Sequence, residues 1–275
     1  MRLEKGGGTS IPLGEVNNIL RRDSRVPAWG DLAGTAQIPT AAVRDAGRWL
    51  DVLATESLNR LGAAFLLLVL TPLIAVLAIL IRLDSPGPIF FRCRRVGLRG
   101  REFGMLKFRK MHVSASGIAL TSPDDDRFTR LGRNLAKSKL DEVPQLWNVV
   151  CGHMRLVGPR PEDAAFVDLR AEAFKAICRV KPGITGLSQL AFARESQILD
   201  PDDRVADYVE RLLPQKIRLD QLYAERRSIG MDLRILFWTI VAVVLRREVA
   251  VHRESGCLNV RRRPAPAPAF EVVEG

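Results

Sequence analysis

The chain has 275 residues, enough for one large domain or two small ones. Hydrophobic residues make up 47% of it and charged residues 27%, which excludes disorder throughout. The four cysteines are far apart and the three histidines form no cluster, which excludes a disulfide-stapled secreted scaffold and argues against a zinc site. Nearly all of the net charge of +11 comes from residues 60–160, and such a basic stretch is typical of a surface that binds phosphates.

The first segment is polar at its start, without the apolar stretch of a secretory signal peptide. It is rich in Gly, Ala, Thr and Pro and has little periodicity. We therefore expect residues 1–54 to be a flexible extension, with one short helix near Val43–Leu53.

The next segment is hydrophobic, because Leu61–Ile81 contains no charged residue and is bounded by Arg60 and Arg82. At about 1.5 Å per residue, a helix of this length matches the hydrocarbon core of a bilayer, about 30 Å thick. A core helix of a water-soluble protein would carry a polar stripe, which this segment lacks. Residues 55–82 are therefore predicted to be a membrane helix.

Thr71 and Pro72 stand at the centre of this segment, where proline removes a backbone donor and disfavours a regular helix. A kinked spanning helix is one solution, with the Thr71 hydroxyl binding a freed carbonyl. Arginines flank both ends, however, and the positive-inside tendency keeps both flanks cytoplasmic. We therefore favour a re-entrant helix–break–helix that enters and leaves the membrane by the same face.

The remaining residues predict one mixed domain and a tail. Ser85–Pro88 forms a turn before a short extended stretch at Ile89–Phe91, and helices alternate with short strands over residues 83–247. Ile235–Leu245 is apolar but too short to span a membrane, so we expect an interfacial helix there. Residues 248–275 are expected to be a disordered tail, whose Arg261–Arg263 can touch anionic lipid.

Two charged motifs are candidates for chemistry. Lys107-Phe108-Arg109-Lys110-Met111 is a dense cationic patch that, taken alone, is typical of a solvated surface. Asp141 and Glu142 are adjacent, and Pro144 predicts that they lie in the first turn of a helix, where anions are favoured. A carboxylate ionised at pH 7 is a usable nucleophile or metal ligand, although acidic residues also simply decorate helix N-termini.

Two loops complete the set. Arg160 lies between Pro159 and Pro161, which restrict its backbone and favour a preformed clamp for phosphate. The stretch Lys181–Gln189 contains Pro-Gly and a second glycine, which is typical of a tight loop whose N–H groups face a phosphate or a nucleobase. Each loop alone is also consistent with a purely structural role.

In their joint order these motifs resemble the bacterial sugar transferases, or monotopic phosphoglycosyl transferases. The resemblance covers residues 55–247. Its matching residues are Thr71-Pro72, Lys107-Phe108-Arg109, Leu140–Leu146, Leu156–Pro161, Lys181–Gly186, Asp220, Tyr223, Ser228 and Asp232–Leu236.

The resemblance implies an α/β-type catalytic domain, mainly helical with few short strands, on the cytoplasmic face of the inner membrane. It would transfer a sugar-1-phosphate from a UDP-sugar to polyprenyl (undecaprenyl) phosphate, release UMP and begin a surface polysaccharide or glycan. Asp141 would be the nucleophile of a covalent phosphosugar intermediate, and Asp141 and Glu142 would hold Mg²⁺. A homo-oligomer is compatible with this assignment. The implied substrate- and phosphate-binding residues are Lys107, Arg109, Arg160, Lys181, Gln189 and Arg194.

Some positions depart from the family pattern: Lys139 stands where serine is usual, and Ala193, followed by Arg194, stands where arginine is usual. Two other classes were weighed. A nucleic-acid-binding protein would fit the pI of about 10.1, but only 6% of residues are aromatic and Leu61–Ile81 would have no role. A catalytically silent membrane scaffold would not need the Asp141-Glu142 pair.

Overall fold

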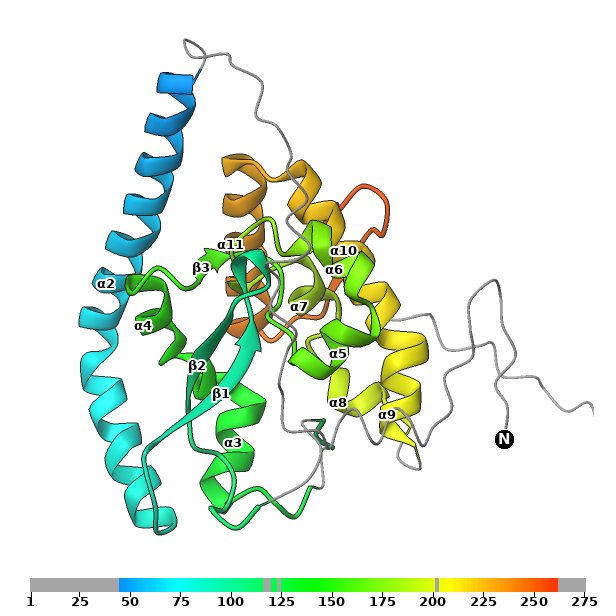
Figure 1. The fold of residues 1–275 in the computed structure, drawn as a ribbon. Coiled ribbons are helices and arrows are strands. Elements are labelled where there is room, and N and C mark those ends of the chain that lie inside the picture. Colours follow the sequence, from blue (N-terminus) through cyan, green and yellow to red (C-terminus); the bar gives the residue numbers. More distant parts are fainter. Residues whose placement is uncertain (1–44, 116–119, 123–124, 201–202, 262–275) are drawn as a thin grey trace, which may run out of the picture.

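The computed structural model describes residues 45–115, 120–122, 125–200 and 203–261. One long helix runs along one side of a domain of short helices and strands (Figure 1). This confirms a mixed domain of helices and short strands that follows one apolar helix. The predictions for residues 1–44 and 262–275 lie outside the described residues.

The long helix α2 (Asp45–Asp84) begins ten residues before the predicted domain boundary and includes most of the predicted Val43–Leu53 helix. It runs without interruption through Thr71 and Pro72, so the predicted break is absent from the secondary structure. Proline removes a single N–H, and one missing hydrogen bond does not end a helix that is otherwise intact. The Thr71 hydroxyl donates to the Leu67 carbonyl at 2.8 Å. This hydrogen bond is compatible with a spanning helix and with a re-entrant one.

The two faces of α2 have different surroundings. On one face Ala63 packs among Met105, Val149 and Met154, and Leu77 and Ile81 pack on Phe108. The other face is exposed along its length, and its most apolar stretch has a mean hydropathy of 3.0 with only 11% of the residues buried. Its exposed large side chains are Leu58, Leu61, Phe65, Leu66, Leu68, Val69, Val76, Ile79, Leu80 and Leu83. An apolar surface of this size on a helix of spanning length indicates membrane association.

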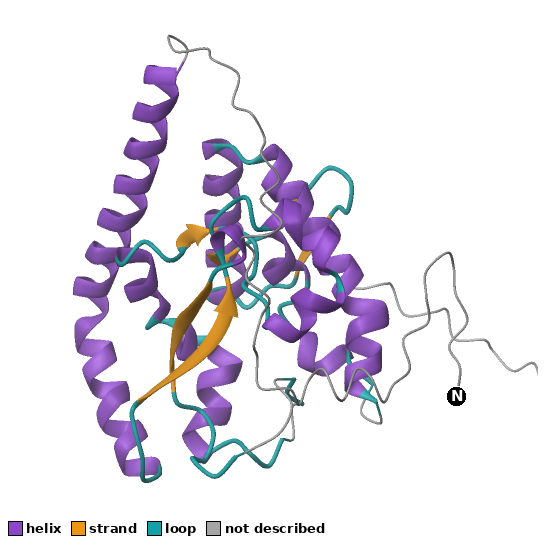
Figure 2. Cartoon of the chain, viewed as in Figure 1, coloured by secondary structure: helices purple, strands orange, loops and turns teal. Residues whose placement is uncertain are grey.

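A β-hairpin and three short helical segments form the part of the domain next to α2 (Figures 1 and 2). Strand β1 (Phe90–Val96) pairs antiparallel with β2 (Glu102–Phe108), with Phe91 opposite Lys107. The predicted extended stretch at Ile89–Phe91 is the beginning of β1. The hairpin loop is η2 (Leu98–Gly100), and the helical segments are α3 (Arg130–Ser138), η3 (Leu140–Glu142) and α4 (Gln145–Val150).

A second unit is built on two parallel three-residue strands, β3 (Arg155–Val157) and β4 (Gly183–Thr185). The helices around it bury a core that includes Phe166, Phe174 and Tyr208. These helices are α5 (Ala164–Leu169), α6 (Ala171–Ile177), α7 (Leu187–Ala191), α8 (Glu195–Ile198), α9 (Arg204–Asp207), the π-helix η4 (Tyr208–Leu212) and α10 (Leu213–Arg226).

The chain then forms α11 (Ile229–Val243), which begins earlier than the predicted Ile235–Leu245 helix. The predicted disordered tail starts too early, because residues 249–260 form a hairpin of β5 (Val249–Val251) and β6 (Leu258–Val260). Val249 and Leu258 are buried against Leu187 and Leu222, and this burial holds the hairpin on the domain.

Candidate active site

The Asp141-Glu142 pair lies on a short turn of its own. Helix α3 ends at Ser138, and Lys139 then adopts a left-handed conformation with φ 60°. This reversal starts the single 3₁₀ turn η3, which Pro144 links to α4. The sequence predicts the pair in the first turn of the helix that contains Pro144. In the structure the pair lies in η3, which precedes α4, and no side chain at position 139 caps this turn.

Asp141 is buried, with only 1% of its surface exposed. Lys110 Nζ, from the segment that follows β2, lies 2.9 Å from Asp141 Oδ2 as an ion pair. The angles of this contact do not make a hydrogen bond, and Oδ2 has no hydrogen-bond partner among the described residues. Lys110 belongs to the predicted cationic patch Lys107–Met111 but is not among the predicted binding residues.

Glu142 is held by two cations. Lys107 donates to Glu142 Oε1 at 2.8 Å, and Arg160 approaches the same oxygen at 3.7 Å. Burial by itself would raise the pKa of Glu142, but Lys107 and Arg160 outweigh burial and hold the pKa well below its ordinary value. Glu142 is therefore ionised at neutral pH and positions both cations.

Arg160 is supported by two interlocked loops. Gly158 N donates to Thr185 O, and Gly183 N donates to Pro159 O, both at 2.9 Å. A Cβ on Gly183 would lie 2.0 Å from Gly158 N, so the backbones can approach this closely only because both positions are glycine. The structure thus joins the two loops that were predicted separately, and it fixes the backbone from which Arg160 extends.

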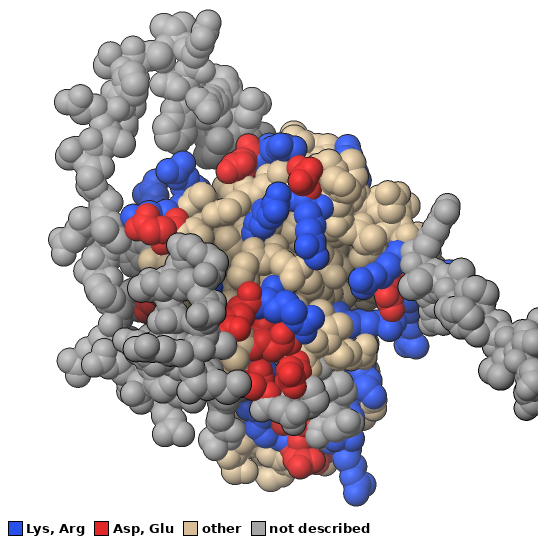
Figure 3. All heavy atoms as spheres, turned by 90° about the vertical axis from the view of Figure 1, so that its right-hand side faces the viewer, with Lys and Arg blue, Asp and Glu red and all other residues tan. Residues whose placement is uncertain are grey.

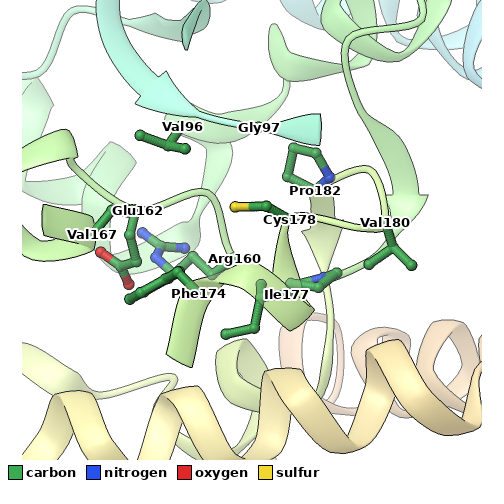
Figure 4. A pocket seen from close by; sticks show the side chains of 11 residues that line it. Val96, Gly97, Arg160, Glu162, Val167, Phe174, Ile177, Cys178, Val180 and Pro182 are labelled. Atoms are coloured by element: carbon green, nitrogen blue, oxygen red, sulfur yellow. The ribbon is translucent and has the colours of Figure 1, made fainter. Parts of the chain in front are cut away.

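Beyond Arg160 lies a polar cavity that is partly open to solvent. Lys216 is buried there, with Nζ at 2.6 Å from both Glu162 Oε1 and the Tyr208 hydroxyl. Burial lowers the pKa of Arg160, but Glu142 and then Glu162 more than compensate and raise it. A smaller pocket adjoins this one, with Arg160 and Glu162 at one end and Cys178 directed into it (Figure 4). Arg160 therefore lies between the Asp141-Glu142 pair and the polar cavity that contains Lys216.

Arg109 contacts the end of α2 and not the carboxylate pair. It is buried, and its guanidinium donates to the carbonyls of Ser85 at 2.7 Å, Ile81 at 3.3 Å and Pro86. These carbonyls belong to the last turn of α2 and to the turn that follows, where few backbone donors remain, and the backbone hydrogen bond from Ser85 N to Ile81 O is long, at 3.4 Å. Arg109 thus ties the end of α2 to the domain.

The other three predicted binding residues contact other groups than the Asp141-Glu142 pair. Lys181 pairs with Glu56 of α2 at 2.5 Å, and Gln189 donates weakly to the carbonyls of Gly158 and Gly183. Arg194 is exposed and pairs with Glu248 at 2.8 Å. Of the six predicted binding residues, the structure brings Lys107 and Arg160 to the carboxylate pair.

Two further buried groups support the Arg160 loop from α10 and α11. The Tyr223 hydroxyl donates to Asp232 Oδ1 at 2.7 Å and to the Val157 carbonyl at 3.2 Å. Asp220 is 2% exposed; burial, offset only in part by the Ser188 hydroxyl, raises its pKa to about 7. Both belong to the motif that ends the family resemblance, and both act on the loops rather than on the carboxylate pair.

The described residues contain no group of three His, Cys, Asp or Glu side chains placed to hold a metal ion. Mg²⁺ at nucleotide sites, however, often takes one or two protein carboxylates and completes its shell with phosphate and water oxygens. Asp141 Oδ2, buried and without a hydrogen bond, is a donor of the required kind. The carboxylate pair therefore fits a divalent ion that is shared with a substrate.

Charge on the domain is mixed where it faces away from α2. Blue and red side chains alternate there with neutral surface (Figure 3). A nucleic-acid-binding surface would present a continuous basic stripe. Four basic residues of the 60–160 segment, Lys107, Lys110, Arg160 and Arg109, contact Asp141, Glu142 or the end of α2.

The long apolar helix and the Asp141-Glu142 pair among cations define a membrane-associated site for phosphate chemistry. Comparison with known proteins identifies its class: a model of the family "Bacterial sugar transferase" matches residues 50–246, and the chain belongs to this family. Members with similar sequences include two that are named UDP-glucose:undecaprenyl-phosphate glucose-1-phosphate transferase. One, from Xanthomonas campestris pv. campestris, is 35% identical over 262 residues, which is 86% of this chain and 52% of the relative.

The second, from Caulobacter vibrioides, is 38% identical over 212 residues, covering 75% of this chain and 73% of the relative. A protein from Aeromonas hydrophila, named as an N-acetylgalactosaminephosphotransferase that uses undecaprenyl phosphate, is 35% identical over 69% of this chain and 43% of its own length. The chain thus spans about half the length of the Xanthomonas relative and less of the Aeromonas one.

Proposed function

We propose that the protein transfers a sugar-1-phosphate from a UDP-sugar to undecaprenyl phosphate and releases UMP. The observation that carries this proposal is the buried Asp141 beside Glu142, with Lys107, Lys110 and Arg160 in ionic contact with the two carboxylates. The names of the relatives support the two substrate classes, and they differ in the sugar. The sugar that this chain uses is therefore left to experiment.

In the proposed reaction Asp141 is a nucleophile. One carboxylate oxygen forms a bond to the phosphorus that carries the sugar, the bond from that phosphorus to the bridging oxygen breaks, and UMP leaves with the electron pair. A phosphate oxygen of undecaprenyl phosphate then attacks the same phosphorus and releases Asp141. Both steps bring anions together, so catalysis depends on placed cations.

Lys107 and Arg160 are the cations that Glu142 positions. In the structure they lie 2.8 and 3.7 Å from one Glu142 oxygen, and Arg160 keeps a third of its side chain exposed. A diphosphate seated against them would have its charge reduced where Asp141 must approach. Mg²⁺, held by Asp141 and Glu142 together with the diphosphate, would supply further charge neutralisation.

We also propose that α2 enters the membrane from the cytoplasmic side and does not cross it. Near its start, Glu56 binds Arg155 and Lys181, and at its end Asp84 accepts from Leu131 N while Arg109 binds the Ile81 carbonyl. A helix that crossed the bilayer would carry one of these ends away from the polar domain. Contacts of Glu56 and of the C-terminal end of α2 with one domain support a helix that stays on one side of the membrane.

Helix α11 supports the same position. Its exposed large side chains recur at helical spacing, at Ile229, Leu233, Phe237 and Ile240, and continue at Val244 beyond its end. An apolar stripe of this kind suits a helix that lies in the membrane interface. The catalytic domain would then rest on the cytoplasmic leaflet of the inner membrane, where undecaprenyl phosphate presents its headgroup.

The experiment measures UMP release by the full chain in membranes with undecaprenyl phosphate, Mg²⁺ and a panel of UDP-sugars. We expect UMP from at least one donor. Asp141→Asn should reduce the rate at least about 10³-fold, because an amide cannot form the acyl-phosphate bond. Asp168→Asn, at an exposed aspartate of α5, is the matched control and should keep the parent rate. An Asp141→Asn variant with parental turnover would contradict the proposed nucleophile.

A scaffold without activity is the other outcome of this test. It predicts no UMP from any donor in the panel, and no phosphosugar adduct when the protein is incubated with nucleotide-sugar extracts of the native cells. Adduct formation in those extracts would instead identify an active enzyme with a donor that the panel lacks.

A further inference from the structure

Lys110 covers the carboxylate that is proposed to react. The Asp141 side chain is 2% exposed and the Lys110 side chain 26% exposed, with Lys110 Nζ 2.9 Å from Asp141 Oδ2. A substrate phosphorus cannot reach an oxygen that is this deeply buried while its lysine partner remains in place. Lys110 must therefore move during the proposed reaction, and the direction of its movement decides its role.

The backbone of Lys110 is fixed while its side chain can swing. The Lys110 carbonyl accepts from Thr129 N at 3.1 Å and lies so close to α3 that a Cβ on Gly132 would be 1.9 Å away from it. The ammonium makes its ion pair without a hydrogen bond to Oδ2 and lies 5.8 Å from the centre of the Phe128 ring. A flexible four-carbon stem on a rigid backbone suits a cation that changes partners.

The two carboxylates differ in how they are neutralised. Glu142 has Lys107 and Arg160, whereas Lys110 is the one ion-pair partner of Asp141 within the described residues. Stability alone gives little reason for such a pair, because burying two charges costs about as much as their attraction returns. A diphosphate arriving between Lys107 and Arg160 offers Lys110 a second anion at the place where Asp141 must react.

We propose that Lys110 is a catalytic cation that passes from Asp141 to the sugar-bearing phosphate when a UDP-sugar binds. This inference rests on the proposed function and adds a residue to it. In the resting enzyme Lys110 neutralises and shields Asp141. When the diphosphate binds, the ammonium moves to a nonbridging oxygen of the phosphate under attack, and this movement uncovers the carboxylate oxygen.

The proposed movement of Lys110 from Asp141 to the phosphate forms and breaks no covalent bond. Asp141 forms the new bond to phosphorus, and UMP takes the electron pair of the bond that breaks. Lys110 remains protonated throughout and follows the negative charge from the carboxylate to the phosphate. The nucleophile thus becomes reactive only when a substrate that replaces its partner is present, which protects Asp141 from other electrophiles.

The test compares Lys110→Met, Lys110→Gln and Lys110→Arg in the full chain with the UDP-sugar that supports UMP release. The Met and Gln variants should lose about 10²–10³-fold in kcat, as expected when a transition-state charge partner is removed. The Gln variant keeps a donor for Asp141 but brings no cation to the phosphate. The Arg variant should retain kcat to within about tenfold of the parent, while the KM for the UDP-sugar changes less than kcat in all three.

Two further measurements separate catalysis from folding. The Gln variant should still unfold in one cooperative thermal transition, with a lower midpoint because the buried Asp141 loses its cation, and intact mass should reveal slower formation of the phosphosugar adduct in the absence of acceptor. Lys175→Met, at a half-exposed lysine of α6, is the control and should behave as the parent. A Gln variant that is folded and keeps the parental kcat would overturn the inference. A parent that releases no UMP and forms no adduct would overturn the proposed function itself.

Discussion

Two groups of cations in this domain have different tasks. The site cluster, Lys107, Lys110 and Arg160, faces Asp141 and Glu142. The helix anchor, Arg109, Arg155 and Lys181, binds α2 through backbone carbonyls and Glu56. Lys110 and Arg160 keep 26% and 33% of their side chains exposed, but Arg155 keeps 3%. Arg109 and Arg155, whose contacts tie α2 to the domain, hold the fold, whereas Lys110 and Arg160 keep the accessible surface that a substrate needs.

The helix anchor and the site cluster together also fix where the carboxylate pair lies relative to the apolar helix α2. The helix anchor grips α2 near both of its ends, and the site cluster is placed by β2 and the loop that follows β3, which pack on or beside the same helix. The fold therefore fixes the distance from the carboxylate pair to the apolar helix. The proposed transfer of a sugar-1-phosphate from a soluble UDP-sugar to a lipid phosphate requires such a fixed relation.

The largest expected difference concerns Arg160. Arg160→Ala should lower kcat for UMP release about 10²-fold, because a phosphate loses its guanidinium partner. The unfolding midpoint should change little, since the side chain is one-third exposed and its one ion pair among the described residues is the 3.7 Å contact with Glu142. Arg179→Ala, at an exposed arginine, serves as the control. If Arg160→Ala unfolded the protein while leaving kcat intact, Arg160 would belong to the anchor instead.

Arg109 should show the opposite pattern. Arg109→Met removes a buried cation from the carbonyls of Ile81, Ser85 and Pro86, so the free energy of unfolding should fall by about 2–4 kcal/mol. The kcat of the folded fraction should stay within tenfold of the parent. Denaturant titration with Arg101→Met, an exposed neighbour, as control measures the difference. A stable but inactive Arg109→Met variant would contradict this prediction and indicate that Arg109 binds phosphate.

The smallest effect concerns Asp220, behind the Arg160 loop. Because burial raises its pKa from 3.8 to about 7, the folded state binds this proton more tightly than the unfolded state. The stabilisation is complete below about pH 4 and is lost as the pH rises toward 7. Asp220→Asn should therefore remove a decline in stability over that window. Equal pH profiles for the parent and the variant would show that Asp220 is not protonated in the fold.

Much of the site could be predicted from the sequence because its chemistry is local. Asp141, Glu142, Lys107 and Arg160 belong to short motifs, and the structure brings these four together. The role of Arg109 could not be predicted from its motif. As the second residue after Lys107 it would share the same face of a continuing strand, but β2 ends at Phe108, and the fold then directs Arg109 to the end of α2.

The continuity of α2 and the hairpin of β5 and β6 also could not be predicted from the sequence. Pro72 predicts a break from its own chemistry, but the outcome depends on whether the neighbouring turns of α2 keep their hydrogen bonds. Residues 249–260 form only two three-residue strands, and they are ordered because Val249 and Leu258 pack in the same core cluster as Leu187. Partners that are distant in sequence decide both cases.

The most direct test of the account is the covalent intermediate. The full chain would be incubated with its UDP-sugar and Mg²⁺ without undecaprenyl phosphate, and its intact mass measured before and after peptide mapping. We predict a mass increase of one sugar-1-phosphate on the peptide that contains Asp141, and its loss when undecaprenyl phosphate is added. Steady UMP release with no adduct, or an adduct on another residue, would contradict the assignment of Asp141 as the nucleophile.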